Sequence, residues 1–456
     1  MQGGAYVFVP AVLIFTGVTI QRCRLTFPKT FAIYCLILLV MQMVASVIVS
    51  SDKIIEYSLQ DRSGLAQLLR QSAVLLVGVM TMFFVYERCS RHNGQAIIER
   101  GVMISAFFVI PVALMQFFAS VPIPLTREIS TVVGYFFRYT DLSEGGIRVA
   151  GFKPEPSLFA VWVAFVFPFL AMAWMGKVQH SRLHKWAAVL MLIIVFLSSS
   201  RTGVGIIVAQ IALMFLVISL HGQVHERRNM IIYIIFSGLT MITTSVLFSN
   251  LPSGASPKFD ILNIAQSLLI TDEAADVSGA ASDHWESNAI RFGAQLANIN
   301  MGFDNILFGV GFSQSVFLIE NYIPSWSSLW EGGRDPFTGT GIHSRIFAEM
   351  GIFGVSMWLA FWFSILYNLY RQTRSRAAPS HKYRPVTLLA VGLGLFLGGF
   401  AHDSLSYFEY WVYFGVALAQ ISLKLNSAAF RHIEHKTIAH EFQKSVALSP
   451  SLAANI

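Results

Sequence analysis

Long apolar stretches, each close to 20 residues and separated by charged clusters, constrain this chain more than any other feature. A helix of about 20 residues crosses the hydrocarbon core of a bilayer, which is about 30 Å thick. Only 12% of the residues are charged, against about 25% in soluble domains. The pattern predicts an all-α, polytopic integral membrane protein with about eleven transmembrane helices. The stretches lie at approximately 4–21, 31–50, 69–86, 101–120, 157–176, 184–200, 203–220, 230–248, 350–370, 386–401 and 410–424.

Basic residues are concentrated on one side of the predicted membrane. If the helices alternate in direction, five interruptions fall on the same face, and they hold sixteen Lys and Arg but only three acids. The positive-inside rule makes this face cytoplasmic. The excess of Lys and Arg over acids therefore indicates the orientation of the helices in the membrane, and no nucleic-acid partner is expected. The five interruptions are QRCRLTFPK, ERCSRHNGQAIIER, KVQHSRLHK, HGQVHERRN and RQTRSRAAPSHKYR.

We expect one transmembrane domain, 1–424, followed by a polar cytoplasmic tail, 425–456. The opposite face carries a long external loop, 249–345, with ten acids and four bases. Long loops without secondary structure are uncommon in compact proteins. Short helices are therefore predicted inside it, at about 258–270 and 286–300.

Arg201, in LSSSRTGVG, interrupts an apolar run that is long enough only for a helical hairpin. An Arg at the bilayer centre costs at least about 2.5–3.5 kcal/mol, and placing it at the hairpin tip avoids that cost. The tip lies on the external face, where positive charge is sparse. Arg201 is thus a candidate phosphate ligand through its planar fork of N–H groups. The alternative is a snorkelling Arg at a helix end.

Arg291, in SNAIRFGAQLANI, is the second candidate phosphate ligand. On a helix it shares one face with Gln295 and Asn298, while apolar residues such as Phe292 share another. This amphipathic helix is predicted to lie on the membrane or on the helix bundle. The alternative is that Arg291 is an ordinary solvated residue.

His343, in GTGIHSRIFAEMGIFG, is predicted in the first turn of a helix that leads into the next membrane span. A histidine there can accept or donate a proton near neutral pH. The alternative is a structural, hydrogen-bonded interfacial histidine. Arg345 and Glu349 are spaced i, i+4 and are expected to pair.

Glu155 lies between two prolines in GIRVAGFKPEPSLFA, which predicts an extended backbone near the membrane surface. Ser157 is then the expected N-cap of the following helix, and Arg148 is a further cation nearby in sequence. His402 and Asp403, in AHDSLSYFEY, form a weaker candidate cluster in an external turn.

Metal and nucleotide signatures are missing from the sequence. It has no H-E-x-x-H, no D-x-D and no nucleotide-binding glycine loop. The three cysteines have no C-x-x-C spacing. We therefore expect no metal and no cofactor.

Three ordered segments resemble the bacterial O-antigen ligase and Wzy-type polysaccharide polymerase superfamily. They are the SSSRTG hairpin, the Arg-bearing AIRFGAQLANINMGFDNILFGVGFSQ and the helix opening IHSRIFAEMGIFGV. The resemblance covers about 185–370, and the remaining helices match only in hydropathy. The GFKPEPSLFA segment looks more like exopolysaccharide and capsule polymerases than like ligases.

The resemblance implies glycosyl transfer at the periplasmic face of the inner membrane, with a glycan on undecaprenyl pyrophosphate as donor. Arg201 and Arg291 would then clamp the pyrophosphate, with Arg148 as a further contact. His343 would match the family's external-loop histidine, although Ser344 follows it where the family often has Asn. The catalytic base is either Glu155 or His343, with Arg345, Glu349, His402 and Asp403 as secondary candidates.

Polymerisation of lipid-linked repeat units is the expected function. An O-antigen ligase acting on lipid A-core is the alternative within the family. A lipid-linked-glycan flippase or secondary transporter is the alternative from another class. The expected partners are the lipid-linked donor and acceptor, the bilayer, and a chain-length regulator or a flippase.

Overall fold

The computed structural model describes residues 28, 30–59, 62–91, 94–120, 156–174, 181–198, 200–249, 280–324, 341–374, 379–402, 405 and 407–423. Within these ranges the chain is almost entirely helical, with one two-stranded hairpin. The elements are α2 (Phe31–Val49), α3 (Ser51–Glu56), β1 (Ser58–Leu59), β2 (Arg62–Ser63), α4 (Gly64–Ser90), α5 (Gly94–Ser120), α7 (Pro156–Ala171), η1 (Met172–Trp174), α8 (Ser181–Leu197), α9 (Arg201–His221), α10 (Val224–Ser249), α12 (Ala280–Asp304), α13 (Ser315–Leu318), η3 (Ile319–Tyr322), α14 (Ile342–Thr373), α15 (Pro379–Ala401) and a last helix over 408–423.

Helices occupy every predicted apolar stretch within the described residues, and the first stretch, 4–21, lies outside them. The all-α class is therefore confirmed. Among the described helices, six are long and apolar enough to cross a membrane, so the total of eleven spans stays a prediction. The six are Phe31–Val49, Gly64–Ser90, Gly94–Gln116, Thr202–His221, Ile342–Thr373 and Tyr383–Ala401.

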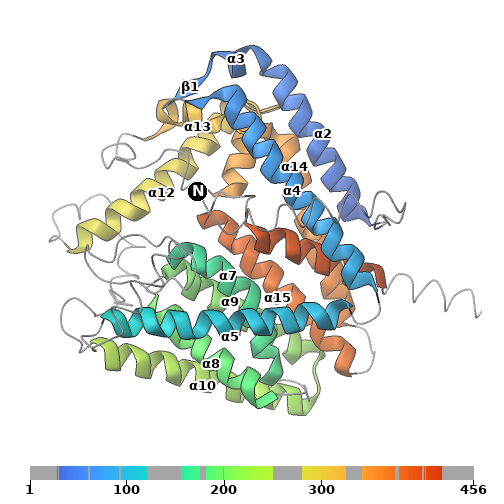
Figure 1. Cartoon of the computed structure of the whole chain (residues 1–456), viewed down its shortest axis with the longest axis vertical. Helices are drawn as coiled ribbons and strands as arrows, with labels where there is room; N and C mark the ends of the chain where they lie inside the picture. Colours follow the sequence, from blue (N-terminus) through green and yellow to red (C-terminus); the bar gives the residue numbers. More distant parts are fainter. Residues whose placement is uncertain are drawn as a thin grey trace, which may run out of the picture.

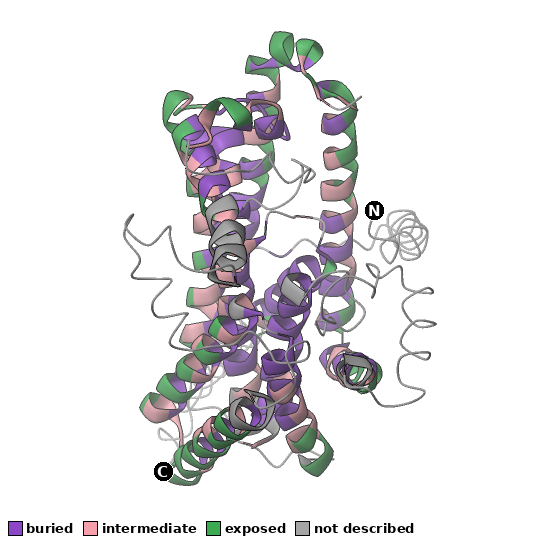
Figure 2. Ribbon diagram, turned by 90° about the vertical axis from the view of Figure 1, so that its left-hand side faces the viewer, coloured by how far each residue is buried: buried purple, intermediate pink, exposed green. Residues whose placement is uncertain are grey.

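The bundle has a buried centre and apolar outer faces. Helices α7, α9 and α15 pack together, with α8 and α10 on one side and α14 and α2 on the other (Figure 1). Figure 2 shows buried residues concentrated in the centre, and large apolar side chains of the peripheral helices, such as Phe108 and Ile48, are exposed. Exposed apolar faces of this extent suit contact with lipid chains.

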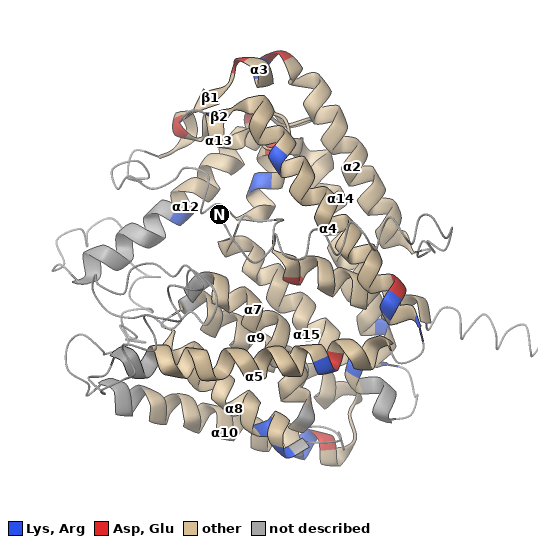
Figure 3. Ribbon diagram, viewed as in Figure 1, with Lys and Arg blue, Asp and Glu red and all other residues tan. Residues whose placement is uncertain are grey.

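Three of the basic interruptions meet on one face of the bundle, as the alternating topology predicted. At the start of α15, Arg384 Nε donates to Glu99 Oε1 of α5 at 2.6 Å. The neighbouring Tyr383 hydroxyl donates to Glu226 Oε1 of α10 at 2.9 Å. Figure 3 shows Lys and Arg gathered at the ends of α5, α8 and α10 on this side. We refer to it as the basic face.

Helix α14 breaks at Gly351, which has φ 65° and ψ −164°. The break is sharp, because Trp358 Nε1 donates a hydrogen bond to His343 Nδ1 at 2.9 Å. In a straight helix these two residues would be separated by about 22 Å along the axis. The sequence predicted a helix running from His343 into the membrane span. The structure instead splits it at Gly351, close to the predicted start of that span.

Groups from two other segments satisfy the backbone at the break. The carbonyls of Ala348 and Glu349 accept from the N–H groups of Val310 and Gly311 at 2.9 and 3.1 Å. The Met350 carbonyl accepts from Gln42 Nε2 of α2 at 2.9 Å. These contacts replace helical hydrogen bonds that the break removes, as buried backbone groups require.

Gly351→Ala tests whether the break supports the fold. A Cβ at this position would lie 2.5 Å from the Leu307 carbonyl group, and the backbone conformation is nearly exclusive to glycine. We expect a loss of at least about 2 kcal/mol of stability, measured by thermal unfolding in detergent.

Gly238→Ala is the matched control, since a Cβ there would meet no atom within 4 Å. Alanine is also the better helix former, so this variant should be neutral or slightly stabilising. Equal melting temperatures for the two variants would contradict the role given to Gly351.

Candidate functional site

The face opposite the basic face is organised around the C-terminal end of α15. The Ile342 N–H at the start of α14 donates to the His402 carbonyl at 2.9 Å. Gln295 Nε2 of α12 donates to the Phe400 carbonyl at 2.7 Å. Gly398 packs where a Cβ would lie 3.6 Å from Ile206 of α9 and 3.9 Å from Val161 of α7. The starts of α7, α9 and α14 and the middle of α12 therefore meet at one place, which we call the helix-end cluster.

Arg201 is the first residue of α9, at the tip of the α8–α9 hairpin, as the sequence predicted. Ser200 is the N-cap, and its Oγ accepts from the Gly203 N–H at 3.2 Å. The helix start packs against α7, since a Cβ at Gly203 would lie 3.2 Å from Ala160. A helix N-terminus carries a partial positive charge that favours anions. The backbone of Arg201 therefore begins a helix whose positive end lies in the helix-end cluster.

Helix α12 confirms the predicted helix over 286–300 and extends beyond it at both ends. Its inward face is made mostly of apolar residues, Ala294, Ala297 and Met301, together with the fully buried Asn298. Arg291 and Gln295 border this face and are half-buried. Phe292 on the other face is 62% exposed. The Asn298 amide therefore faces the protein interior.

Asn298 has an unused hydrogen-bonding capacity. Neither its Oδ1 nor its Nδ2 has a hydrogen-bond partner among the described residues. A buried amide without partners costs about 1–3 kcal/mol, so such a group calls for a water or a ligand.

His343 is buried, with both ring nitrogens engaged. Nδ1 accepts from Trp358 Nε1 at 2.9 Å, so Nε2 carries the proton and donates to the Phe396 carbonyl of α15 at 2.9 Å. The ring can accept a proton only after the bond to Trp358 breaks. In this conformation His343 joins the two segments of α14 to α15, which matches its structural alternative better than a general base.

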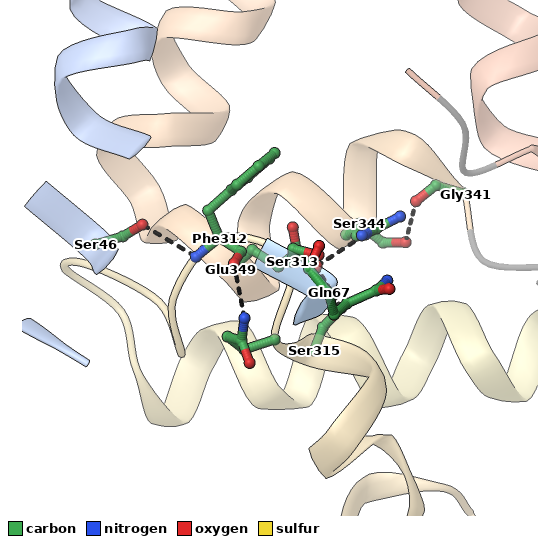
Figure 4. A network of polar contacts seen from close by, with 10 residues as sticks. Ser46, Gln67, Phe312, Ser313, Ser315, Gly341, Ser344 and Glu349 are labelled. Carbon is green, nitrogen blue, oxygen red and sulfur yellow. Dashed lines mark hydrogen bonds and ion pairs between the residues drawn. The ribbon is translucent and has the colours of Figure 1, made fainter. Parts of the chain in front are cut away.

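Arg345 and Glu349 form the predicted i, i+4 pair, and the pair is buried. Arg345 Nε donates to Glu349 Oε1 at 2.8 Å, and the two side chains are 12% and 2% exposed. Ser315 Oγ donates to the same carboxylate oxygen at 2.8 Å (Figure 4). The sequence offered no sign of this third partner, because Ser315 lies 34 residues away.

The loop that carries Ser315 is held by buried polar contacts. Ser46 Oγ of α2 accepts from the Phe312 N–H at 3.2 Å. Gln314 Nε2 donates to the Gly64 carbonyl at the start of α4 at 3.2 Å. Ser313 adopts a positive φ of 67°, uncommon for a residue other than glycine. The loop thus links α2 and α4 to the broken helix (Figure 4).

Tyr57 and Tyr322 lie beside this loop on the same face. The Tyr57 ring stacks on Phe317 with ring centroids 5.8 Å apart. Burial raises the pKa of both tyrosine hydroxyls, and for Tyr322 a hydrogen bond with Asp304 adds to the shift. Both groups stay neutral near neutral pH and are not candidate bases.

His402 and Glu409 are buried on opposite sides of the turn that joins α15 to the helix 408–423. The His402 ring lies edge-on to Tyr407, with centroids 5.9 Å apart. His402 was predicted as a candidate from the sequence, whereas Glu409, a carboxylate only 7% exposed, was not. An acid within an apolar helical segment is itself a signal of function.

Several predicted site residues lie outside the described residues, namely Arg148, Glu155 and Asp403, as does the predicted helix 258–270. Helix α7 begins at Pro156, so Ser157 lies inside the helix rather than at its N-cap. Proline is favoured at a first helical position because its missing N–H is not needed there. Glu155 therefore directly precedes a helix start that belongs to the helix-end cluster.

Within the described part of the chain, no three His, Cys, Asp or Glu residues come together as a metal site. No protein-family model matches this chain, and no curated protein is significantly similar to it. The arrangement defines a membrane protein with cationic and amide groups at one face. It is suited to holding an anionic group where helix N-termini meet.

Glu349→Ala tests the buried pair. The substitution removes the buried carboxylate that both Arg345 and Ser315 bind, so we expect the free energy of unfolding to fall by about 3–5 kcal/mol, measured by unfolding in detergent. The double variant Arg345→Ala/Glu349→Ala removes both charges and should cost less than Glu349→Ala alone. Arg345→Ala completes the cycle. If the losses of the two single variants add up to the loss of the double variant, the pair has no energetic coupling.

Proposed function

We propose that this protein polymerises undecaprenyl-pyrophosphate-linked oligosaccharide repeat units at the periplasmic face of a bacterial inner membrane. The observation that carries the proposal is that the first two turns of α9, which Arg201 begins, the Arg291 helix and the start of the His343 helix all contact the C-terminal part of α15. These three segments are far apart in sequence, and they are the three on which the resemblance rests. Their convergence supports a shared site.

The proposed chemistry is transfer of a glycan from its lipid pyrophosphate to a sugar hydroxyl. The glycosidic bond to pyrophosphate breaks while the acceptor oxygen bonds to the sugar carbon, and the acceptor proton passes to a base. The leaving group gains negative charge as the bond breaks, so preorganised cations stabilise the transition state more than the ground state. Arg201 and Arg291 would supply that charge, assisted by the positive helix ends.

The buried amide of Asn298 supports the binding of a polar ligand. Asn298 lies on the Arg291 face of α12, two turns further along, and its amide lacks partners among the described residues. Sugar hydroxyls are natural partners for an amide oxygen and NH₂ group. We propose that this face of α12 contacts the glycan next to its pyrophosphate.

Glu155 and His343 both stay candidates for the catalytic base, but His343 is already engaged by Trp358. His343 would have to give up its bond from Trp358 to accept a proton. Glu155 lies outside the described residues, and in the sequence it comes directly before Pro156, where α7 begins. We therefore favour Glu155 as the base and His343 as a residue that positions α14 against α15.

Reconstitution in liposomes decides between the candidate functions. Purified protein supplied with lipid-linked single repeats should elongate them without nucleotide, metal or ion gradient. Transfer of a finished glycan to lipid A-core, with no elongation, would instead identify a ligase. Movement of the lipid-linked repeat across the bilayer with no new glycosidic bond would identify a flippase and refute the proposal.

Arginine-to-lysine variants test the proposed clamp. Lysine keeps the charge of Arg201 or Arg291 but loses the bidentate fork. We expect each Lys variant to lower the elongation rate at least about tenfold and each Ala variant about 10²–10³-fold, with normal membrane insertion. Arg228→Lys, at an exposed position in α10 on the basic face, should keep full activity. Full activity of Arg201→Ala would make Arg201 an ordinary snorkelling residue.

Cysteine labelling tests the orientation. Cys35 and Cys89 are buried, so a Cys23→Ser background should give little labelling of its own. In intact cells, Asn300→Cys should react with an impermeant maleimide, and Arg374→Cys should react only after the membrane is opened. Both positions are exposed in the fold, so protection of residue 300 in intact cells would place the site on the wrong side.

A further inference from the structure

A groove far from the helix-end cluster opens between four helices near the basic face. It has a volume of about 880 Å³ and is open along the outer surface of the helices. Its walls are apolar, and its floor and rim come from α2, α9, α14 and α15. The residues that matter here are Phe31, Leu213, Phe363, Tyr367, Leu389 and Arg371.

The groove ends at Arg371, and Arg374 follows it one turn further along the chain at the end of α14. Arg371 lies in the last turn of α14, and its guanidinium sits 5.8 Å from the centroid of the Tyr367 ring. Arg374, just beyond, sits 5.2 Å from the centroid of the Tyr370 ring. Tyr367 and Tyr370 both line the groove. Cation–π contacts thus hold two exposed cations at one end of the apolar groove.

This combination selects a ligand with two parts. The apolar walls suit a hydrocarbon chain, and the arginines suit a phosphate, which guanidinium groups bind bidentately. Phe31 begins α2 directly after one basic interruption and Arg371 begins another. The mouth of the groove therefore lies at headgroup level on that face. Basic pockets between membrane helices on the cytoplasmic side are recognised sites for anionic headgroups.

We propose that the groove binds one anionic diacyl phospholipid, with an acyl chain along Phe363 and Leu389 and its phosphate at Arg371 and Arg374. This inference does not depend on the catalytic proposal, because the groove is separate from the helix-end cluster. A neutral lipid would fill the apolar walls equally well but would gain nothing from the two arginines. The positive charges of Arg371 and Arg374 therefore favour an anionic headgroup over a neutral one.

Native mass spectrometry on the full chain tests the proposal. Protein is taken from nanodiscs containing equal amounts of phosphatidylglycerol and phosphatidylcholine. We expect one retained phosphatidylglycerol per chain. Arg371→Gln/Arg374→Gln should lower that retention at least about tenfold, and Arg228→Gln, on the same face but outside the groove, should not. Ala360→Phe keeps the arginines but fills the groove and should also lower retention.

Two outcomes would overturn the proposal. Equal retention of both lipids, unchanged in the double-Gln variant, would show adsorption to apolar surface only. An efficient disulfide between Ser364→Cys and a cysteine placed in 4–21 would show that the chain's own first apolar stretch fills the groove. Each variant is first checked for a single symmetric peak in size-exclusion chromatography, so that loss of lipid is not confused with loss of fold.

Discussion

The break of α14 at Gly351 is the constraint on which the rest of this face depends. A helix that continued through Gly351 would carry His343 and Trp358 far apart and would leave the 306–311 segment without backbone partners. With the break, Ile352 N–H bonds the Ile306 carbonyl at 2.7 Å, and Val310 and Gly311 bond the end of the first segment. Non-helical backbone at membrane depth persists only where protein or water satisfies it. Here α2, the 306–311 segment and the two halves of α14 satisfy one another.

Close packing on α15 then places the polar groups. Glycines at 392, 394 and 399 leave space that side chains from other helices enter: the Tyr413 hydroxyl, the Gln210 amide and the His343 ring. Gln210 is fully buried and donates to the carbonyls of Ala164 in α7 and Ala390 in α15 at 2.7 and 3.0 Å. Small residues that let helices approach, with polar side chains bridging them, are typical of membrane bundles. The helix-end cluster therefore rests on closely packed helices joined by buried hydrogen bonds.

Much of this arrangement could be predicted from the sequence, since its signals are local. Hydropathy locates the helices, LSSSRTG forms a hairpin tip with Ser200 as N-cap, and i, i+4 spacing pairs Arg345 with Glu349. The break at Gly351 could not be predicted, because EMGIFGV reads as a continuous apolar helix and its conformation depends on a segment some forty residues earlier. The same holds for Ser315 on Glu349 and for Trp358 on His343. Glu409 could have been predicted as a candidate, because it is an acid at the start of an apolar stretch, but it belongs to no recognised motif.

The distribution of polarity explains why a site forms at helix ends rather than in the middle of the bundle. Cations at mid-membrane cost at least about 2.5–3.5 kcal/mol each, so an anion-binding centre is cheaper where helix N-termini already supply positive ends. Helix α12 packs against α14 with Ala294, Ala297, Met301 and Asn298 buried. Its Gln295 side chain donates to the Phe400 carbonyl at the end of α15, and the half-buried Arg291 lies one turn earlier on the same side of the helix. A half-buried cation and a buried amide thus lie beside the first turns of other helices, at the end of the bundle rather than in its middle.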